Sequence, residues 1–345
     1  MASFLRNVRL IVGALVLAFT VLLTANAGAQ QINPTAESVK EQQLLSQHKR
    51  ISGTCSIPDE KACTLEQTRG RDWRRFTRVL LPLIGGGAIL GMFALVVVFY
   101  LVRGPVRMAH GRSGRIMIRF SSFERFVHWT ATVCFIILAL SGLNITFGKF
   151  VLLPLIGPDA FTALARAGKY AHNFLSFPFT LSVVAIFLMW IAWNIPNRLD
   201  IQWMMEGGGF GEKHPPADLF NAGQKSIYWV VVLGGALVAA SGYVLMLPFF
   251  GTTIAGMQLA HIVHGLVALL YMAAMVFHIY MGTVGEEGAF EGMWDGTVDE
   301  EWAKQHHSIW HEREVANGNI ATAPSEVDKG TIMRPLPAGQ VQPAK

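Results

Sequence analysis

Five long apolar runs without a single charged residue constrain this chain more than any other feature. They cover residues 79–102, 127–147, 171–195, 226–250 and 259–283, and each reaches the roughly 20 residues that cross a bilayer. The whole chain is 52% hydrophobic and only 15% charged, against roughly 25% charged in soluble domains. We therefore expect an all-α membrane protein with five transmembrane helices, and we exclude both a disordered chain and an ordinary soluble one.

The N-terminus has the layout of a secretory signal peptide. Arg6 and Arg9 precede an apolar core, and small residues follow up to residue 29, as expected for residues 1–29 acting as a signal; an uncleaved signal anchor is the alternative. Both readings place residues 30–78 in the periplasm. That segment holds Cys55 and Cys63, which form a disulfide or remain thiols, whereas Cys134 lies in a span as a small packing residue.

Charge around the spans predicts their orientation. The span at 79–102 is followed by a basic linker, 103–126, with six arginines, which is typical of a cytoplasmic loop. A unit of four more spans, 127–283, then returns the chain to the cytoplasm, and the tail 284–345 stays there, partly disordered. The net charge of +5 belongs to these flanks, so we expect contact with membrane lipid and no nucleic-acid binding.

Five histidines lie inside apolar spans: His128, His172, His261, His264 and His278. A lone intramembrane histidine is ordinarily bonded to a neighbouring helix, but this set is arranged by depth. His264 and His278 are 14 residues apart, which places them on one helix face about 21 Å apart along the axis. His128 begins its helix at the cytoplasmic side and His172 begins its helix at the outer side. The depths pair His128 with His278, and His172 with His264.

Two pairs of facing imidazoles stacked along a helical bundle describe two b-type haems with two histidine ligands each. Such iron has both axial positions filled and transfers electrons. Zinc needs about four ligands in one cluster, which these histidines cannot form, whereas a proton relay stays open as an alternative. His261 lies 17 residues from His278, on another face of the helix, and we favour His264 over it.

Several motifs occur in a characteristic order. They read F-E-R-F-V-H-W-T at 123–130, A-L-S-G at 139–142, N-I-P-N-R-L-D at 194–200, N-A-G-Q-K at 221–225, F-H-I-Y-M at 277–281, G-M-W-D-G at 292–296 and W-A-K-Q-H-H at 302–307. In this order and spacing, residues 116–310 resemble the gamma subunit, or cytochrome b556, of membrane-bound formate dehydrogenase. The short form of that subunit begins near residue 116, so the resemblance leaves the first span and the external segment unexplained.

The resemblance implies a complete electron-transfer assignment. His128 and His278 would bind the haem on the cytoplasmic side, and His172 and His264 the haem on the periplasmic side, with His172 matching its motif only loosely. Asn221, Gly223 and Gln224 would line the quinone site, although Asn221 could instead be a helix cap. The partners would be an alpha subunit with molybdenum or tungsten and an iron–sulfur beta subunit, in a bacterial inner membrane. This chain would be the electron-transferring, quinone-reducing subunit of the enzyme, with substrate oxidation in its partners.

Two other functions stay open at this point. One is the cytochrome b subunit of a hydrogenase or a thiosulfate reductase, and the other is a haem-free membrane anchor or transporter. We further expect Gly85, Gly86 and Gly87 to allow close helix packing. We expect His306, His307 and His311 to be solvated tail residues, with chelation of a metal ion as the alternative. We expect residues 30–77 to clamp an external partner.

Overall fold

The computed structural model describes residues 70–210, 214–248 and 253–319. The predicted signal peptide, nearly all of the predicted external segment with Cys55 and Cys63, and the end of the tail lie outside these residues, so the predictions for them stay predictions. Cys134 is a buried free thiol, as expected for a packing residue.

Five helices of the described residues are long and apolar enough to span a membrane, which confirms the predicted fold class. The spans are Asp72–Arg103, Ser122–Val151, Leu153–Asn194, Ala222–Met246 and Ile254–Gly285. The first consists of α4 (Gly70–Arg75), η2 (Phe76–Leu80) and α5 (Leu81–Arg103), and the next two are α6 (Ser122–Val151) and α7 (Leu153–Asn194). The fourth combines α9 (Ala222–Trp229), η3 (Val230–Gly234) and α10 (Gly235–Met246), and the fifth combines α11 (Ile254–Tyr280) and η4 (Met281–Gly285).

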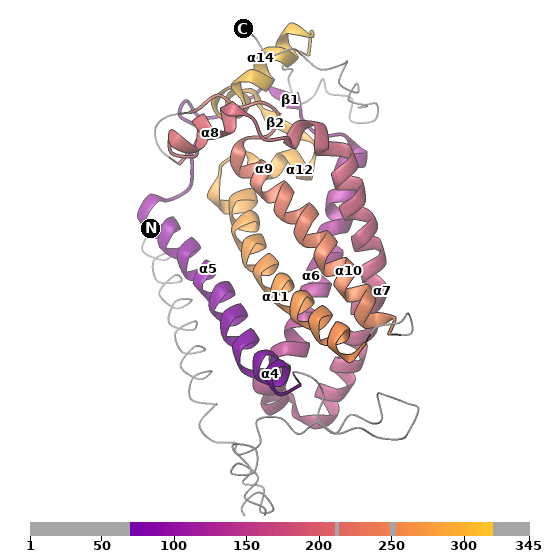
Figure 1. Ribbon diagram of the computed structural model, residues 1–345. Coiled ribbons are helices and arrows are strands. Elements are labelled where there is room, and N and C mark those ends of the chain that lie inside the picture. Colours follow the sequence, from indigo (N-terminus) through magenta and orange to yellow (C-terminus); the bar gives the residue numbers. More distant parts are fainter. Residues whose placement is uncertain (1–69, 211–213, 249–252, 320–345) are drawn as a thin grey trace, which may run out of the picture.

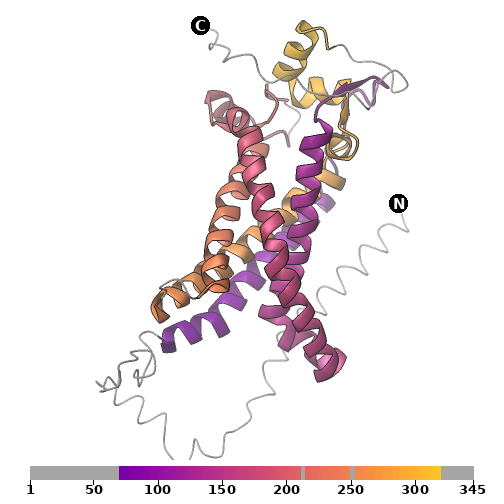
Figure 2. The ribbon, with the colours of Figure 1, turned by 90° about the vertical axis from the view of Figure 1, so that its right-hand side faces the viewer.

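The helices form an elongated bundle in which α6 and α7 run together. Figure 1 shows α11 between α5 and α10, and the turned view in Figure 2 shows α6 and α7 crossing α5 and α10. Many large apolar side chains on the helices are exposed, including Leu83, Leu140, Leu181 and Leu259. This is the pattern of helices whose outer faces meet lipid.

The segment between the second and third predicted spans, 148–170, is mostly helical and is not an extended loop. Helix α6 continues to Val151 and α7 begins at Leu153, with a break inside α7 where Gly157 takes a φ of 78°. Glycine adopts this left-handed conformation easily, and Pro158 directly after it suits the first turn of the next helical segment. The sequence between the two spans thus forms a helical hairpin that extends the bundle.

The extra helix α5 packs closely on α11 through glycines. A Cβ atom added to Gly85 would come within 2.8 Å of both Cβ and Cγ of Leu269, and one added to Gly265 within 2.7 Å of Leu81 Cδ2. Each helix therefore inserts a leucine over a glycine of the other. A Cβ on Gly87 would meet nothing within 4 Å, so the close packing expected of the glycine run depends on Gly85.

One end of the bundle, at the top of Figure 1, is covered by a small folded cap. It contains β1 (Ile116–Ile118), α8 (Arg198–Met205), α12 (Ala289–Trp294), β2 (Thr297–Asp299), α13 (Glu300–His306) and α14 (Ser308–Ala316). The strands β1 and β2 pair antiparallel, with Met117 opposite Val298. We call this end of the molecule the capped end.

The expectation that His306 and His307 are solvated is wrong. Their exposed fractions are 8% and 0%, and Trp302 and Trp310 beside them are 2% and 0% exposed. Arg119 of the basic linker donates from Nη2 to the carbonyl oxygen of Leu219 at 2.7 Å and lies 3.1 Å from His307 Nε2. Burial and the Arg119 guanidinium hold the pKa of His307 well below its usual value. The tail is therefore a structural cap up to the end of α14.

Candidate haem and quinone sites

The structure brings the four predicted haem ligands together in two pairs. The ring centroids of His128 and His278 are 6.3 Å apart, and those of His172 and His264 are 6.0 Å apart. The pairs are those expected from the predicted depths. Both use α11, with one partner from α6 and one from α7.

These distances fit iron between each pair of rings. Two metal–imidazole bonds of roughly 2.0–2.1 Å, with about 1.1 Å from each nitrogen to its ring centroid, place two ligated rings about 6.3 Å apart. Nδ1 of His128 is also a buried nitrogen without a hydrogen-bond partner. A buried polar atom that the protein leaves unpaired is costly, and a bound group would remove that cost.

The pair formed by His172 and His264 is oriented by hydrogen bonds. Ser141 Oγ donates to the carbonyl oxygen of Ile137 at 2.8 Å, so it accepts from His172 Nδ1 at 2.7 Å. His264 Nδ1 donates to the carbonyl oxygen of Val238 at 2.9 Å. With Nδ1–H committed in both rings, Nε2 is the nitrogen that can bind a metal, and such second contacts fix the ring and its tautomer.

A repeated serine–glycine pair supports both of these rings, although only its first copy belongs to the motifs identified from sequence. Ser141 and Gly142 face His172, and Ser241 and Gly242 face His264. A Cβ on Gly242 would lie 3.1 Å from Cε1 of His264, so a larger residue would crowd the ring. The motif A-L-S-G recurs as A-A-S-G at 239–242, and this repeat was the available signal.

His261 belongs to a different contact. Its ring lies 5.6 Å from that of Trp73, at the start of the extra helix. The structure therefore places His264, and not His261, opposite His172. Among the described residues, no group of three or more histidine, cysteine or acidic side chains could hold a metal ion.

A large cavity of about 500 Å³ lies between the His128–His278 pair and the cap. Its lining includes both of these histidines together with Asn221, Gly223 and Gln224, the three residues expected to line a quinone site. His172 and His264 are not part of the lining. The volume lies within the range of roughly 300–1,000 Å³ typical of ligand pockets.

Asn221 and Gln224 also cap the helix that they begin. Asn221 Oδ1 accepts from the backbone N–H of Gln224 at 2.9 Å, and Gln224 Oε1 accepts from that of Asn221 at 3.1 Å. The helix-cap alternative for Asn221 is thus present in the structure. Because the oxygens take these bonds, the side-chain NH₂ groups are the donors that a cavity ligand could use.

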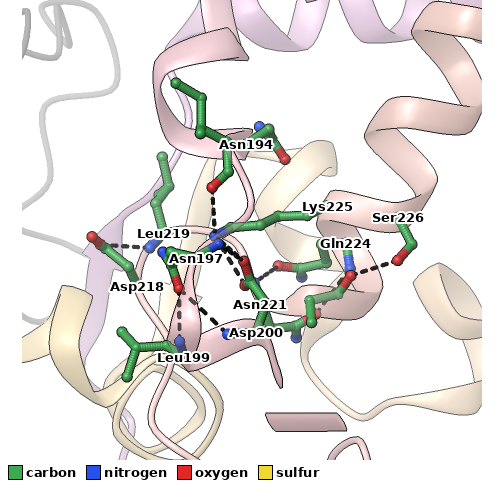
Figure 3. Close-up of polar contacts among 12 residues, drawn as sticks. Asn194, Asn197, Leu199, Asp200, Asp218, Leu219, Asn221, Gln224, Lys225 and Ser226 are labelled. Carbon is green, nitrogen blue, oxygen red and sulfur yellow. Dashed lines mark hydrogen bonds and ion pairs between the residues drawn. The ribbon is translucent and has the colours of Figure 1, made fainter. Parts of the chain in front are cut away.

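Two sequence motifs interlock beside the cavity (Figure 3). Lys225 of N-A-G-Q-K is buried and its Nζ lies 2.9 Å from a carboxylate oxygen of Asp200, from N-I-P-N-R-L-D. Asn197 and Asp200 form a second reciprocal cap at the start of α8. Asn197, Asp200 and Lys225 therefore hold Asn221 and its neighbours in position. They are not among the residues that line the cavity beside His128 and His278.

Comparison with known proteins identifies the family. The family described as prokaryotic cytochrome b561 matches residues 119–296, slightly more than half of the chain. The chain belongs to this family. It is therefore a multi-pass membrane cytochrome b, and membership in the family implies haem b.

Three relatives show where the similarity is concentrated. The nitrate-inducible formate dehydrogenase cytochrome b556(Fdn) subunit of Escherichia coli K12 is 27% identical over 223 residues, 63% of this chain and 98% of the relative. The cytochrome b556(fdo) subunit of formate dehydrogenase from the same strain is 28% identical, covering 58% and 93%. The formate dehydrogenase cytochrome b556 subunit of Haemophilus influenzae is 27% identical, covering 58% and 84%. The chain is thus similar to nearly whole cytochrome b556 subunits, as its motifs predicted.

Proposed function

We propose that this chain is the cytochrome b subunit of a formate dehydrogenase and carries electrons from an iron–sulfur partner through two b haems to a quinone. His172 and His264 would hold one haem, and His128 and His278 the other. Haem iron with two histidine ligands supplies one-electron transfer with no open coordination position. Formate oxidation would take place in an alpha subunit with molybdenum or tungsten.

The observation that carries this proposal is the pair of ring contacts along one helix. The centroid distances of 6.3 and 6.0 Å recur at two depths, which the helical rise over 14 residues separates by about 21 Å. Two redox groups at this separation bridge most of a hydrocarbon layer of roughly 30 Å. A haem-free anchor would need neither two histidine pairs at two depths nor the serines, Ser141 and Ser241, that contact one of the pairs.

Arginines at the capped end give the proposal a direction. Arg103, Arg107, Arg112 and Arg115 lie at or just after the end of the first span, and such clusters mark the cytoplasmic side. The cap and the cavity would then be cytoplasmic, and the His172–His264 pair would lie toward the periplasm. Electrons moving inward to a quinone that takes up cytoplasmic protons would help to build the membrane potential.

The cavity residues would bind and orient the quinone. The NH₂ groups of Asn221 and Gln224 can donate to a quinone oxygen, while the reciprocal cap keeps both side chains in place. The buried Lys225–Asp200 pair fixes the start of this helix against α8. Gly223 permits a close approach to Trp203, because a Cβ there would lie 3.2 Å from the indole.

Counting haem in matched histidine variants tests the proposal. We expect two haems b per chain in the wild-type complex, and one in His264→Ala. His261→Ala is the control, because His261 lies three residues away on the same helix and contacts Trp73 instead; it should keep both. Two haems in His264→Ala, or a loss of haem in His261→Ala, would contradict the assigned ligands. Reduction of the haems by dithionite but not by formate would keep the haem pairs and contradict the assigned electron donor.

A further inference from the structure

Glu286 is a carboxyl group in an unusual place. It directly follows η4 at the end of the last span, and it is the one carboxyl among the described residues that line the cavity. The same cavity is lined by His278 and Gln224. An acidic side chain at a site proposed to reduce a quinone needs a reason, because a buried charge without a function is costly.

The chain around Glu286 is held firmly. The backbone N–H of Val106 donates to the carbonyl oxygen of Gly285 at 2.8 Å, and that of Glu287 donates to the carbonyl oxygen of Val106 at 2.9 Å. On the side chain, Trp302 Nε1 donates to Glu286 Oε1 at 2.9 Å. The carboxyl therefore has a fixed position between the cap and the cavity.

The surroundings of Glu286 determine whether its carboxyl group holds a proton near neutral pH. Burial raises the pKa of Glu286 to about 7, against the Trp302 hydrogen bond and the nearby Arg119 charge, which both lower it. His128, His278 and His306 also line the cavity, and burial lowers the pKa of His306 to about 3. At neutral pH, His306 is therefore uncharged, whereas the Glu286 carboxyl both holds and releases a proton. A proton donor works best when its pKa lies near the working pH.

We propose that Glu286 donates the protons that accompany quinone reduction in this cavity. This inference depends on the proposed function, which supplies the electrons. A quinone gains two electrons and two protons to become a quinol. For each electron that arrives, Glu286 gives one proton to a quinone oxygen, becomes a carboxylate and regains a proton from water, so that two such cycles complete the reaction.

A route for the returning protons lies along the cavity. His214 is exposed, and its ring lies 5.9 Å from that of His306. Both rings line the cavity, so this side connects the space around Glu286 with the surface at the capped end. Neutral imidazoles both donate and accept protons.

Glu286→Gln in the assembled complex tests the proposal, with Glu287→Gln as the matched control. Glutamine keeps an oxygen for Trp302 Nε1 and removes the proton. The Glu287 carboxylate instead accepts from the backbone N–H of Met108 and is not among the cavity residues. In rapid mixing of formate-reduced complex with a quinone, we expect Glu286→Gln to slow haem reoxidation on the order of 100-fold, with haem reduction by formate unchanged. Glu287→Gln should match the wild type.

A pH profile and an infrared measurement distinguish the loss of the proton donor from a folding defect of the variant. Because the protonated carboxyl is the donor, wild-type reoxidation should be fastest below pH 7 and should fall as the pH rises above it, and this dependence should be absent in Glu286→Gln. Redox-difference infrared spectra should show a protonated-carboxyl band that only this variant lacks. Equal reoxidation rates in wild type and Glu286→Gln across pH would overturn the role of Glu286. Failure of quinone to reoxidise the wild-type haems would instead overturn the proposed function.

Discussion

Replacing Gly85 by alanine tests how closely the extra helix is packed on the haem-bearing helix. The added methyl group would lie 2.8 Å from both Cβ and Cγ of Leu269, whereas carbon atoms pack best at roughly 3.5–4.0 Å. Leu269 cannot rotate its own Cβ away, and it is only 2% exposed. Helix α5 must therefore move outward by about 0.7–1.2 Å to relieve the overlap.

A shift of this size has a calculable consequence. A radial gap of about 0.5–1 Å removes a quarter to a half of the dispersion energy of each contact that it opens, and overpacking in tight cores costs about 1–3 kcal/mol. The reciprocal contact of Leu81 over Gly265 lies on the same interface, so it would open too. We expect Gly85→Ala to lower the free energy of unfolding by about 1–3 kcal/mol.

Gly87→Ala is the matched control, because a Cβ there meets nothing within 4 Å. Both variants add the same methyl group to the same helix, so their intrinsic helix propensities change equally. Unfolding of the purified protein by SDS in mixed micelles should show the loss for Gly85→Ala and no loss for Gly87→Ala. Equal stabilities of the two variants would refute the close packing of α5 on α11.

Four further substitutions test three separate parts of the structure. Ser141→Ala removes the acceptor that orients His172, and we expect about 10- to 100-fold weaker haem binding there, measured as haem occupancy on dilution; unchanged occupancy would argue against this role. Burial alone would raise the pKa of Asp299, but backbone amides and a hydroxyl that donate to its carboxylate lower the pKa. The ionised carboxylate therefore stabilises the cap fully above the usual pKa of aspartate. This stabilisation is lost as the pH falls through the lowered pKa. Asp299→Ala should destabilise the cap by about 0.5–2 kcal/mol at neutral pH, seen as faster hydrogen exchange in α14. Lys225→Met leaves the Asp200 charge unpaired and should cost about 3–5 kcal/mol, with partial recovery on adding Asp200→Asn; no recovery would contradict the pairing.

The spans and the histidine pairs were predictable because each depends on a periodic or charge-based signal within one segment. A charge-free run of about 20 residues spans a bilayer whatever surrounds it. Likewise, 14 residues in a helix fix both the face and the separation of His264 and His278. The partner histidines then followed from their depth in the spans predicted from sequence, although His172 lies inside α7, which already begins at Leu153.

The cap was missed because its stability depends on contacts between distant segments. His307 is buried by Arg119, which lies 188 residues away in sequence, and by Trp302 beside it. Polar residues after a last span look the same in sequence whether they are solvated or folded back. The position of Glu286 in the cavity was missed for the same reason, because it depends on Val106 and Trp302 as well as on η4.

Haem content and reducibility of the purified membrane complex test the central claim most directly. We expect two haems b per chain, both reduced when formate is the sole reductant and both reoxidised by an added quinone. A complex that contains this chain and no haem b would contradict it, and would return the four paired histidines to a purely structural role.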